Sequence, residues 1–252
     1  MMKAVYKNEW RKLRLQKKYI VLLVIGLALG LLWAILGKLI SSALNQLSGA
    51  VIQFPMGMSL TGSLPFFSYF YLPLMVCMAV SDLFISEYSH QTIKTSLMRP
   101  VTRLKLYSAK LLAILTYFAG FLACLFVVTA ATAVIMGYVT SPWLILQALL
   151  GYAMTLIPLA VLLCFAALLA QVIRSGSLFM FLMIFSMILS LVLPLLIPVL
   201  QGTLFYGYMG WFKLFSGSLA GWGAVPMPLL ILLGTGGACY FGGTLLMDKR
   251  DF

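Results

Sequence analysis

The chain has 252 residues, of which 63% are hydrophobic and only 9% are charged, with a net charge of +12. Together with a mean hydropathy of +1.08, this composition excludes a water-soluble fold and indicates an integral membrane protein. A helix needs about 20 apolar residues to cross a bilayer, and runs of that length recur along the sequence.

The first 18 residues, MMKAVYKNEWRKLRLQKK, predict an amphipathic helix. Tyr6, Trp10 and Leu13 share one face with the second methionine, and basic residues that include Arg11 and Arg14 fill the other faces. This pattern is typical of a helix that lies in the membrane interface, where anionic lipid headgroups attract its basic residues. The alternative is that these charges only fix the topology.

The remaining residues, 19–252, are expected to form a single all-α membrane domain with six transmembrane helices. These are predicted at about 19–39, 64–85, 108–137, 144–170, 177–200 and 225–247. Prolines inside these runs predict kinked helices. The aromatic and glycine-rich segment 201–224 is expected to form either a short re-entrant or interfacial helix pair or an ordinary loop.

The basic residues indicate the orientation of the six spans. All but two of the 17 lysines and arginines, the exceptions being Lys38 and Lys213, fall on one side of this arrangement. The positive-inside rule then predicts that both termini are cytoplasmic. Asp82, at the same end of the second span, is expected to pair with a nearby base or with water.

The sequence lacks the common motifs for nucleotide binding, metal binding and catalysis. There is no G-x-x-x-x-G-K-[ST] phosphate loop, the one histidine is His90, and the four cysteines show no metal-binding spacing. We therefore expect no catalytic residue, no metal site and no nucleic-acid partner. Small residues recur along two spans, Gly26 with Gly30 in the first and Gly234, Ala238 and Gly242 in the last, and they favour close helix contacts.

The outer half of the second span contains an aromatic run, LPFFSYFYLP. One interpretation is an aromatic girdle that packs at the membrane interface. The other is an aromatic wall of a lateral pocket for an amphipathic ligand, on a substrate pathway formed by Phe66, Phe67, Tyr69, Phe70 and Tyr71.

An unusually charged internal stretch, EYSHQTIKTSLMRPVTRLKLYSAK, occupies residues 87–110. Ser86 is expected to cap a short helix that starts near Glu87, Pro100 to break it at Arg99, and Thr102 to open the next helix. The polar side chains of this short helix, which include Glu87, His90, Gln91, Lys94 and Thr95, are expected to be available to water or to a partner.

This stretch resembles the signature of ABC-2 type transporter permeases, in which a glutamate precedes G-T-[IL]-K, then P-V-S-R, then a lysine that enters the third span. The matching residues are Glu87, Thr92, Ile93, Lys94, Pro100, Val101, Arg103 and Lys110. Gln91 stands where the family usually has glycine, and Thr102 where serine is common. The basic N-terminal helix, the six spans and the charged tail DKRDF agree with the layout of the family.

The resemblance implies a permease subunit that pairs with a second copy or a sister permease and with two separate ABC ATPase subunits, which hold ATP and magnesium. It implies that residues 86–107 couple the permease to the ATPase and that 87–99 form the docking helix. The ATPase-coupling residues would be Glu87, Tyr88, His90, Gln91, Thr92, Lys94, Thr95, Arg99 and Arg103.

Small permeases of this kind resemble bacterial exporters of antimicrobial peptides and other amphipathic molecules, including immunity systems, in the cytoplasmic membrane. The alternatives are a polytopic membrane enzyme, a substrate-binding immunity protein without transport, or a secondary transporter.

Overall fold

The computed structural model describes residues 2–48, 60–89, 102–137, 139, 141–197, 204–214 and 225–249. Within these ranges the chain is helical without strands, and six segments are long and apolar enough to cross a membrane. They are Lys17–Gly37, Leu64–Ile85, Arg103–Ile135, Pro142–Val172, Gly176–Leu196 and Pro226–Asp248. The prediction of an all-α membrane protein with six spans is therefore confirmed.

The first three spans contain regular and widened helices. An N-terminal helix, α1 (Met2–Leu15), precedes the long helix α2 (Lys17–Ser48). The second span is a run of α4 (Leu64–Phe66), the π-helical turn η1 (Phe67–Tyr71), α5 (Leu72–Val80), the π-helical turn η2 (Ser81–Ile85) and α6 (Ser86–Ser89). The third span is α8 (Arg103–Ile135), which Thr102 precedes in an extended conformation, as predicted for the residue that opens this helix.

The fourth span divides into α9 (Pro142–Met154) and α10 (Leu156–Val172). The fifth span is α11 (Gly176–Leu196), and the sixth is α12 (Pro226–Lys249). Between these two spans lies a 3₁₀ helix, η4 (Phe205–Leu214).

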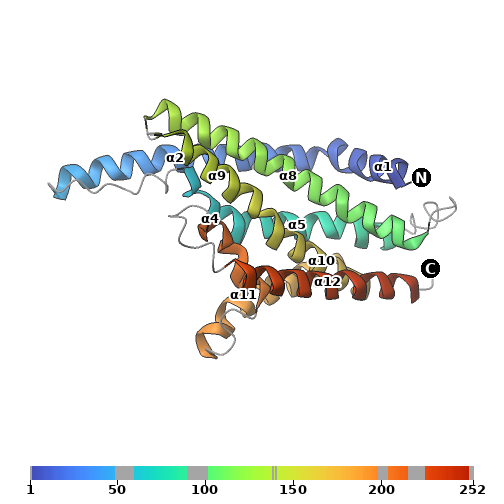
Figure 1. The fold of residues 1–252 in the computed structure, drawn as a ribbon. Coiled ribbons are helices and arrows are strands. Elements are labelled where there is room, and N and C mark those ends of the chain that lie inside the picture. The colour runs from blue at the N-terminus through green and yellow to red at the C-terminus, as the bar shows by residue number, and fades with distance from the viewer. Residues whose placement is uncertain are drawn as a thin grey trace.

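Both chain termini lie at one end of the bundle, here called the terminal end (Figure 1). The second span is the most enclosed of the six, whereas the first, fifth and sixth expose most of their apolar side chains. In a bilayer those exposed faces would contact lipid tails. The core therefore lies around the second span, between α8 and α10.

Two prolines disturb the spans in which they lie. Pro73 has no N–H to donate to the carbonyl of Tyr69, and that carbonyl instead accepts a hydrogen bond of 2.5 Å from the Tyr206 hydroxyl. Pro158 follows the break between α9 and α10 at Thr155, whose hydroxyl donates to the Gly151 carbonyl at 2.8 Å. The Tyr206 hydroxyl thus satisfies a backbone carbonyl that lipid cannot satisfy.

The described part of the segment 201–224 packs on the protein. The buried side chains of η4 are Tyr206, Met209, Trp211 and Phe212. They contact η1, α9, α10, α11 and α12, and the Tyr69 and Tyr206 rings lie 6.2 Å apart. This part is thus a short helix and not an ordinary loop, while 201–203 and 215–224 lie outside the described residues.

Several glycines allow helices of the same chain to approach closely, as predicted for Gly26 with Gly30 and for Gly242, whereas a Cβ atom on Gly234 would have no neighbour within 4 Å. A Cβ atom on Gly26 would lie 2.6 Å from the Phe121 ring, and one on Gly30 would lie 2.6 Å from Leu125, so α2 packs on α8 at these positions. On α12, Gly236 and Gly242 face α10, since a Cβ atom there would lie 3.1 Å from Val161 or 3.0 Å from Leu168.

Substitution of Gly26 by valine should therefore overpack the contact between α2 and α8. The Phe121 ring that it would meet is itself buried between the rings of Phe67 and Tyr71. We expect Gly26→Val to lower the free energy of unfolding by about 1–3 kcal/mol more than Gly37→Val, because a Cβ atom on Gly37 has no neighbour within 4 Å. Thermal unfolding of both variants in detergent measures this difference, and equal midpoints would contradict the packing described.

Candidate functional site

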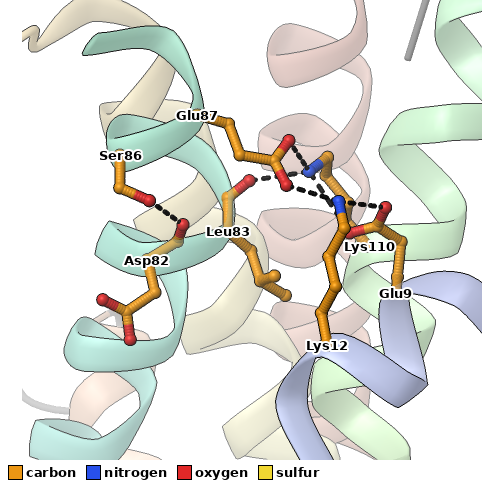
Figure 2. Close-up of polar contacts among 7 residues, drawn as sticks. All are labelled: Glu9, Lys12, Asp82, Leu83, Ser86, Glu87 and Lys110. Carbon is orange, nitrogen blue, oxygen red and sulfur yellow. Dashed lines mark hydrogen bonds and ion pairs between the residues drawn. The ribbon is translucent and has the colours of Figure 1, made fainter. Parts of the chain in front are cut away.

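Four charged side chains from three parts of the chain meet at the terminal end of the bundle. Glu9 and Lys12 come from α1, Glu87 from α6 and Lys110 from α8, as Figure 2 shows. We call these four residues the ion cluster. It joins α1 to the end of the second span and to the first turns of the third.

Each lysine of the ion cluster lies between two carboxylates. Lys12 Nζ is 2.7 Å from Glu87 Oε1 and 3.0 Å from Glu9 Oε1. Lys110 Nζ is 2.6 Å from Glu87 Oε2 and 3.4 Å from Glu9 Oε2. With two lysines and two glutamates, the ion cluster has no net charge.

Three members of the ion cluster are shielded from solvent, whereas the side chain of Lys12 is 35% exposed. Lys110 is 0% exposed, Glu9 1% and Glu87 9%. Moving one such ion out of water costs several kcal/mol, which only good geometry and further hydrogen bonds can offset. Replacing both members of an ion pair should therefore destabilise the protein less than replacing one member, because a single replacement leaves an unpaired buried charge.

The backbone of the second span supplies the remaining partner of Lys110. Its ammonium group donates to the Leu83 carbonyl at 2.7 Å. Leu83 lies in the π-helical turn η2, where the Ser86 N–H bonds five residues back to the Ser81 carbonyl. The Ser86 hydroxyl also donates to the Asp82 carbonyl in this turn (Figure 2). A widened turn of this kind offers carbonyl groups to side-chain donors and is frequent at functional sites.

The opposite charges of the ion cluster shift the pKa values of Glu87 and Lys12. Burial alone would raise the pKa of Glu87, but Lys110 and Lys12 outweigh it and lower that pKa below its ordinary value. Burial would likewise lower the pKa of Lys12, but Glu87 and Glu9 raise it overall. Both groups are therefore charged at neutral pH, as the ion pairs require.

A second ionic contact fixes the start of α2 to the same span. Lys18 forms an ion pair with Asp82, and the Tyr19 hydroxyl donates to the same carboxylate. The Tyr19 carbonyl in turn accepts a hydrogen bond of 2.8 Å from the Tyr117 hydroxyl of α8. The prediction that Asp82 pairs with a nearby base is therefore confirmed.

The structure places only part of the predicted ATPase-coupling set. His90, Gln91, Thr92, Lys94, Thr95 and Arg99 lie outside the described residues. Tyr88 lies in α6. Arg103 Nη1 donates to the Asp248 carbonyl at 2.7 Å and to the Met247 carbonyl at 3.3 Å, at the end of α12. Here a cation meets the negative end of a helix dipole.

Two expectations about the charged stretch are wrong. Ser86 does not cap a separate helix, because the helix of the second span continues through η2 into α6. The Glu87 side chain is not available to water or a partner, because Lys12 and Lys110 bind it inside the protein.

The predicted amphipathic helix at the N-terminus is α1, and its apolar face packs on the protein. Leu13 is buried, and Tyr6 and Trp10 are half-buried against the core. The Tyr6 hydroxyl donates to Thr116 Oγ1 of α8 at 3.1 Å. Arg11 and Arg14 are exposed on other faces. The position of α1 at the membrane surface stays a prediction.

The five aromatic residues of the predicted substrate pathway do not share one face. Phe67 and Tyr71 are buried beside Phe121, with ring centroids 5.9 and 5.7 Å from it, and Tyr69 contacts η4. Only Phe66 and Phe70 lie toward the outside, where Phe66 stacks on Trp33 and Phe70 is 58% exposed. The five residues therefore do not line one surface, and a substrate pathway along them stays a prediction.

Sequence reasoning missed Glu9 and Lys12, which it treated as part of a charged surface. One signal was present: Glu9 is the only acidic residue before Asp82, so its position in a strongly basic helix required an explanation. Lys110 was noted as a motif residue and as the start of a span, but its burial was not expected. Within the described ranges, His, Cys, Asp and Glu side chains form no group of three that could hold a metal ion.

A double-mutant cycle on Glu87 and Lys110 tests the ion cluster. We expect Lys110→Met alone to lower the free energy of unfolding by about 3–5 kcal/mol, because it leaves two buried carboxylates with one lysine. Adding Glu87→Gln should restore part of this loss, with a coupling energy of at least about 1 kcal/mol, because the pair of Glu9 and Lys12 then remains balanced. Unfolding in detergent measures each variant.

Lys105→Met on the exposed face of α8 is the matched control and should change stability little. Strictly additive effects of Glu87→Gln and Lys110→Met would contradict the ion cluster.

Comparison with known proteins identifies the family of the chain. A search of curated proteins found no match. Residues 5–196 match the family described as ABC-2 family transporter protein. The match covers most of the chain and includes the whole ion cluster and the charged stretch that resembles the family signature. The chain therefore belongs to the ABC-2 family of transporter proteins.

Proposed function

We propose that this protein is the permease subunit of an ATP-driven exporter in the bacterial cytoplasmic membrane, with both termini in the cytoplasm. Two separate ABC ATPase subunits would bind and hydrolyse ATP, and a second permease copy or a sister permease would complete the transport pathway. The family match over residues 5–196 and the six apolar spans support this function.

The position of the ion cluster is the observation that carries the proposed coupling to the ATPase. The segment that resembles the docking helix of the family, 87–99, begins with Glu87 in α6, and its residues 90–99 lie outside the described residues. A force applied to this segment would act on Glu87 and, through its ion pairs, on Lys12 and Lys110. Three elements, α1, the second span and α8, would then move together when the ATPases close.

An amphipathic substrate, such as an antimicrobial peptide, an antibiotic or a lipid-like molecule, is the class that we propose. No connection between the spans is longer than residues 197–225, which are too few for a separate folded domain, so substrate selection would depend on residues within the membrane. The outward aromatic residues Phe66 and Phe70, beside Trp33, offer a surface at which such a molecule could enter from the bilayer.

Charge reversal in the predicted docking helix, 87–99, tests the ATPase contact. The permease is co-expressed with the ABC ATPase that is encoded beside its own gene, and the retained ATPase is measured after affinity purification. We expect Lys94→Glu combined with Arg99→Glu to reduce the retained ATPase at least about tenfold, because like charges across an interface are repelled. Arg174→Glu combined with Lys213→Glu carries the same change of charge elsewhere and should retain the ATPase.

Equal retention by both double variants would show that this segment is not the dock. Failure of the unaltered permease to retain any such ATPase would overturn the proposed function itself. Survival of a permease-deletion strain on a panel of amphipathic peptides and drugs, with and without the restored permease, tests the substrate class.

A further inference from the structure

The first turns of α8 hold the last turns of α12 at the terminal end (Figure 1). The Arg103 guanidinium donates to the Asp248 carbonyl at 2.7 Å and to the Met247 carbonyl at 3.3 Å. Five residues further along α8, the hydroxyls of Ser108 and Tyr240 share a hydrogen bond of 2.8 Å. Because the last carbonyl groups of a helix have no partner within it and carry partial negative charge, a cation at this position fixes the end of α12.

The side chain of Tyr107 lies between the second span and α12. It is 0% exposed, and its ring centroid is 5.7 Å from that of Phe84 and 5.8 Å from that of Tyr240. A Cβ atom on Gly243 would lie 2.1 Å from the Tyr107 hydroxyl oxygen, so the glycine leaves the room that this hydroxyl occupies. The Tyr107 ring therefore connects the second span to the sixth.

The part of the second span that contacts Tyr107 also contacts the ion cluster. Phe84 lies in η2 next to Leu83, whose carbonyl accepts a hydrogen bond from Lys110. The ammonium group of Lys110 also lies 5.6 Å from the centroid of the Phe84 ring, which is a cation–π distance. A displacement of Glu87 and η2 would therefore act on α8 at Tyr107 as well as at Lys110.

We propose that Arg103 and Tyr107 are positioning residues that make the end of the sixth span move with the second and third spans. Arg103 would then act inside the permease and not as a contact to the ATPase. It is half-buried with its guanidinium directed at α12, whereas Lys105, two residues further on, is exposed. This inference rests on the proposed function, because the ATPases would supply the movement.

The test uses the full permease in complex with the ABC ATPase that is encoded beside its own gene. Hydrogen–deuterium exchange of residues 103–110 and 240–249 is compared before and after ATP and vanadate trap the bound ATPases. In the unaltered complex we expect trapping to change the exchange rate of both segments by at least about twofold. In Arg103→Gln combined with Tyr240→Phe, the change in 103–110 should remain, whereas the change in 240–249 should fall to less than about half.

Three comparisons separate positioning from other roles. Arg103→Lys in place of Arg103→Gln keeps a cation at the end of α12 and should restore most of the change, and Lys105→Gln is the matched loss of charge that should leave it unaltered. The double variant should retain the ATPase within about twofold of the unaltered permease, unlike Lys94→Glu combined with Arg99→Glu. A purely structural role would raise the exchange of 240–249 equally before and after trapping.

Loss of the ATPase from the Arg103 variant to the same extent as from the charge reversal would make Arg103 an ATPase contact and overturn the inference. It would also be overturned, with the proposed function intact, if trapping left 240–249 unchanged in the unaltered complex or if the change in 240–249 survived in the double variant. If the unaltered permease retains no ATPase, the proposed function fails and this inference fails with it.

Discussion

Lys110 is a positive charge with no solvent-exposed surface, and the terminal end of the bundle is arranged around that charge. Glu87, Glu9 and the Leu83 carbonyl together surround its ammonium group. An unpaired ammonium group in this position would cost several kcal/mol, so the second span, α1 and α8 must all be in place for it to be stable. The ion cluster therefore forms only when these three parts of the chain are correctly placed, and it also holds them in contact.

The need to pair Lys110 connects several features of the first three spans. The π-helical turn η2 places Leu83 where its carbonyl meets Lys110. The second ion pair, between Lys18 and Asp82, holds the start of α2 against the same turn. Glycines at 26 and 30 then let α2 continue along α8 at close range. The first three spans are thus joined by charge at the terminal end and by close packing further along.

The sequence was sufficient to predict the six spans because each span is a local property of the chain: a long apolar run between polar residues. It also indicated the family, because residues 87–110 form a continuous motif. It was not sufficient to predict the ion cluster, which brings together side chains from positions 9, 12, 87 and 110. Which face of α1 turns inward depends on packing against α8, and helical periodicity favoured the apolar residues without indicating that Glu9 would be buried beside them.

The directions of the side chains in the aromatic run of the second span were not predictable, for a similar reason. Its five residues are close in sequence, but the π-helical turn η1 and ordinary helical rotation direct Phe67 and Tyr71 to the core, Tyr69 to η4 and the other two outward. Pro73 favours this distortion because it has no N–H to donate to the Tyr69 carbonyl. That carbonyl instead accepts a hydrogen bond from the Tyr206 hydroxyl. Sequence alone gives the composition of such a segment, whereas the directions of its side chains require the tertiary structure.

The central claim is that the ion cluster holds α1 against the bundle, and hydrogen–deuterium exchange of the backbone amides of residues 2–15 tests it most directly. If the claim is correct, these amides are protected in the unaltered permease about as well as those at the start of α8, and Lys110→Met removes the protection of α1 while the second half of α8 stays protected. Fast exchange of residues 2–15 in the unaltered protein, or unchanged protection in Lys110→Met, would contradict it.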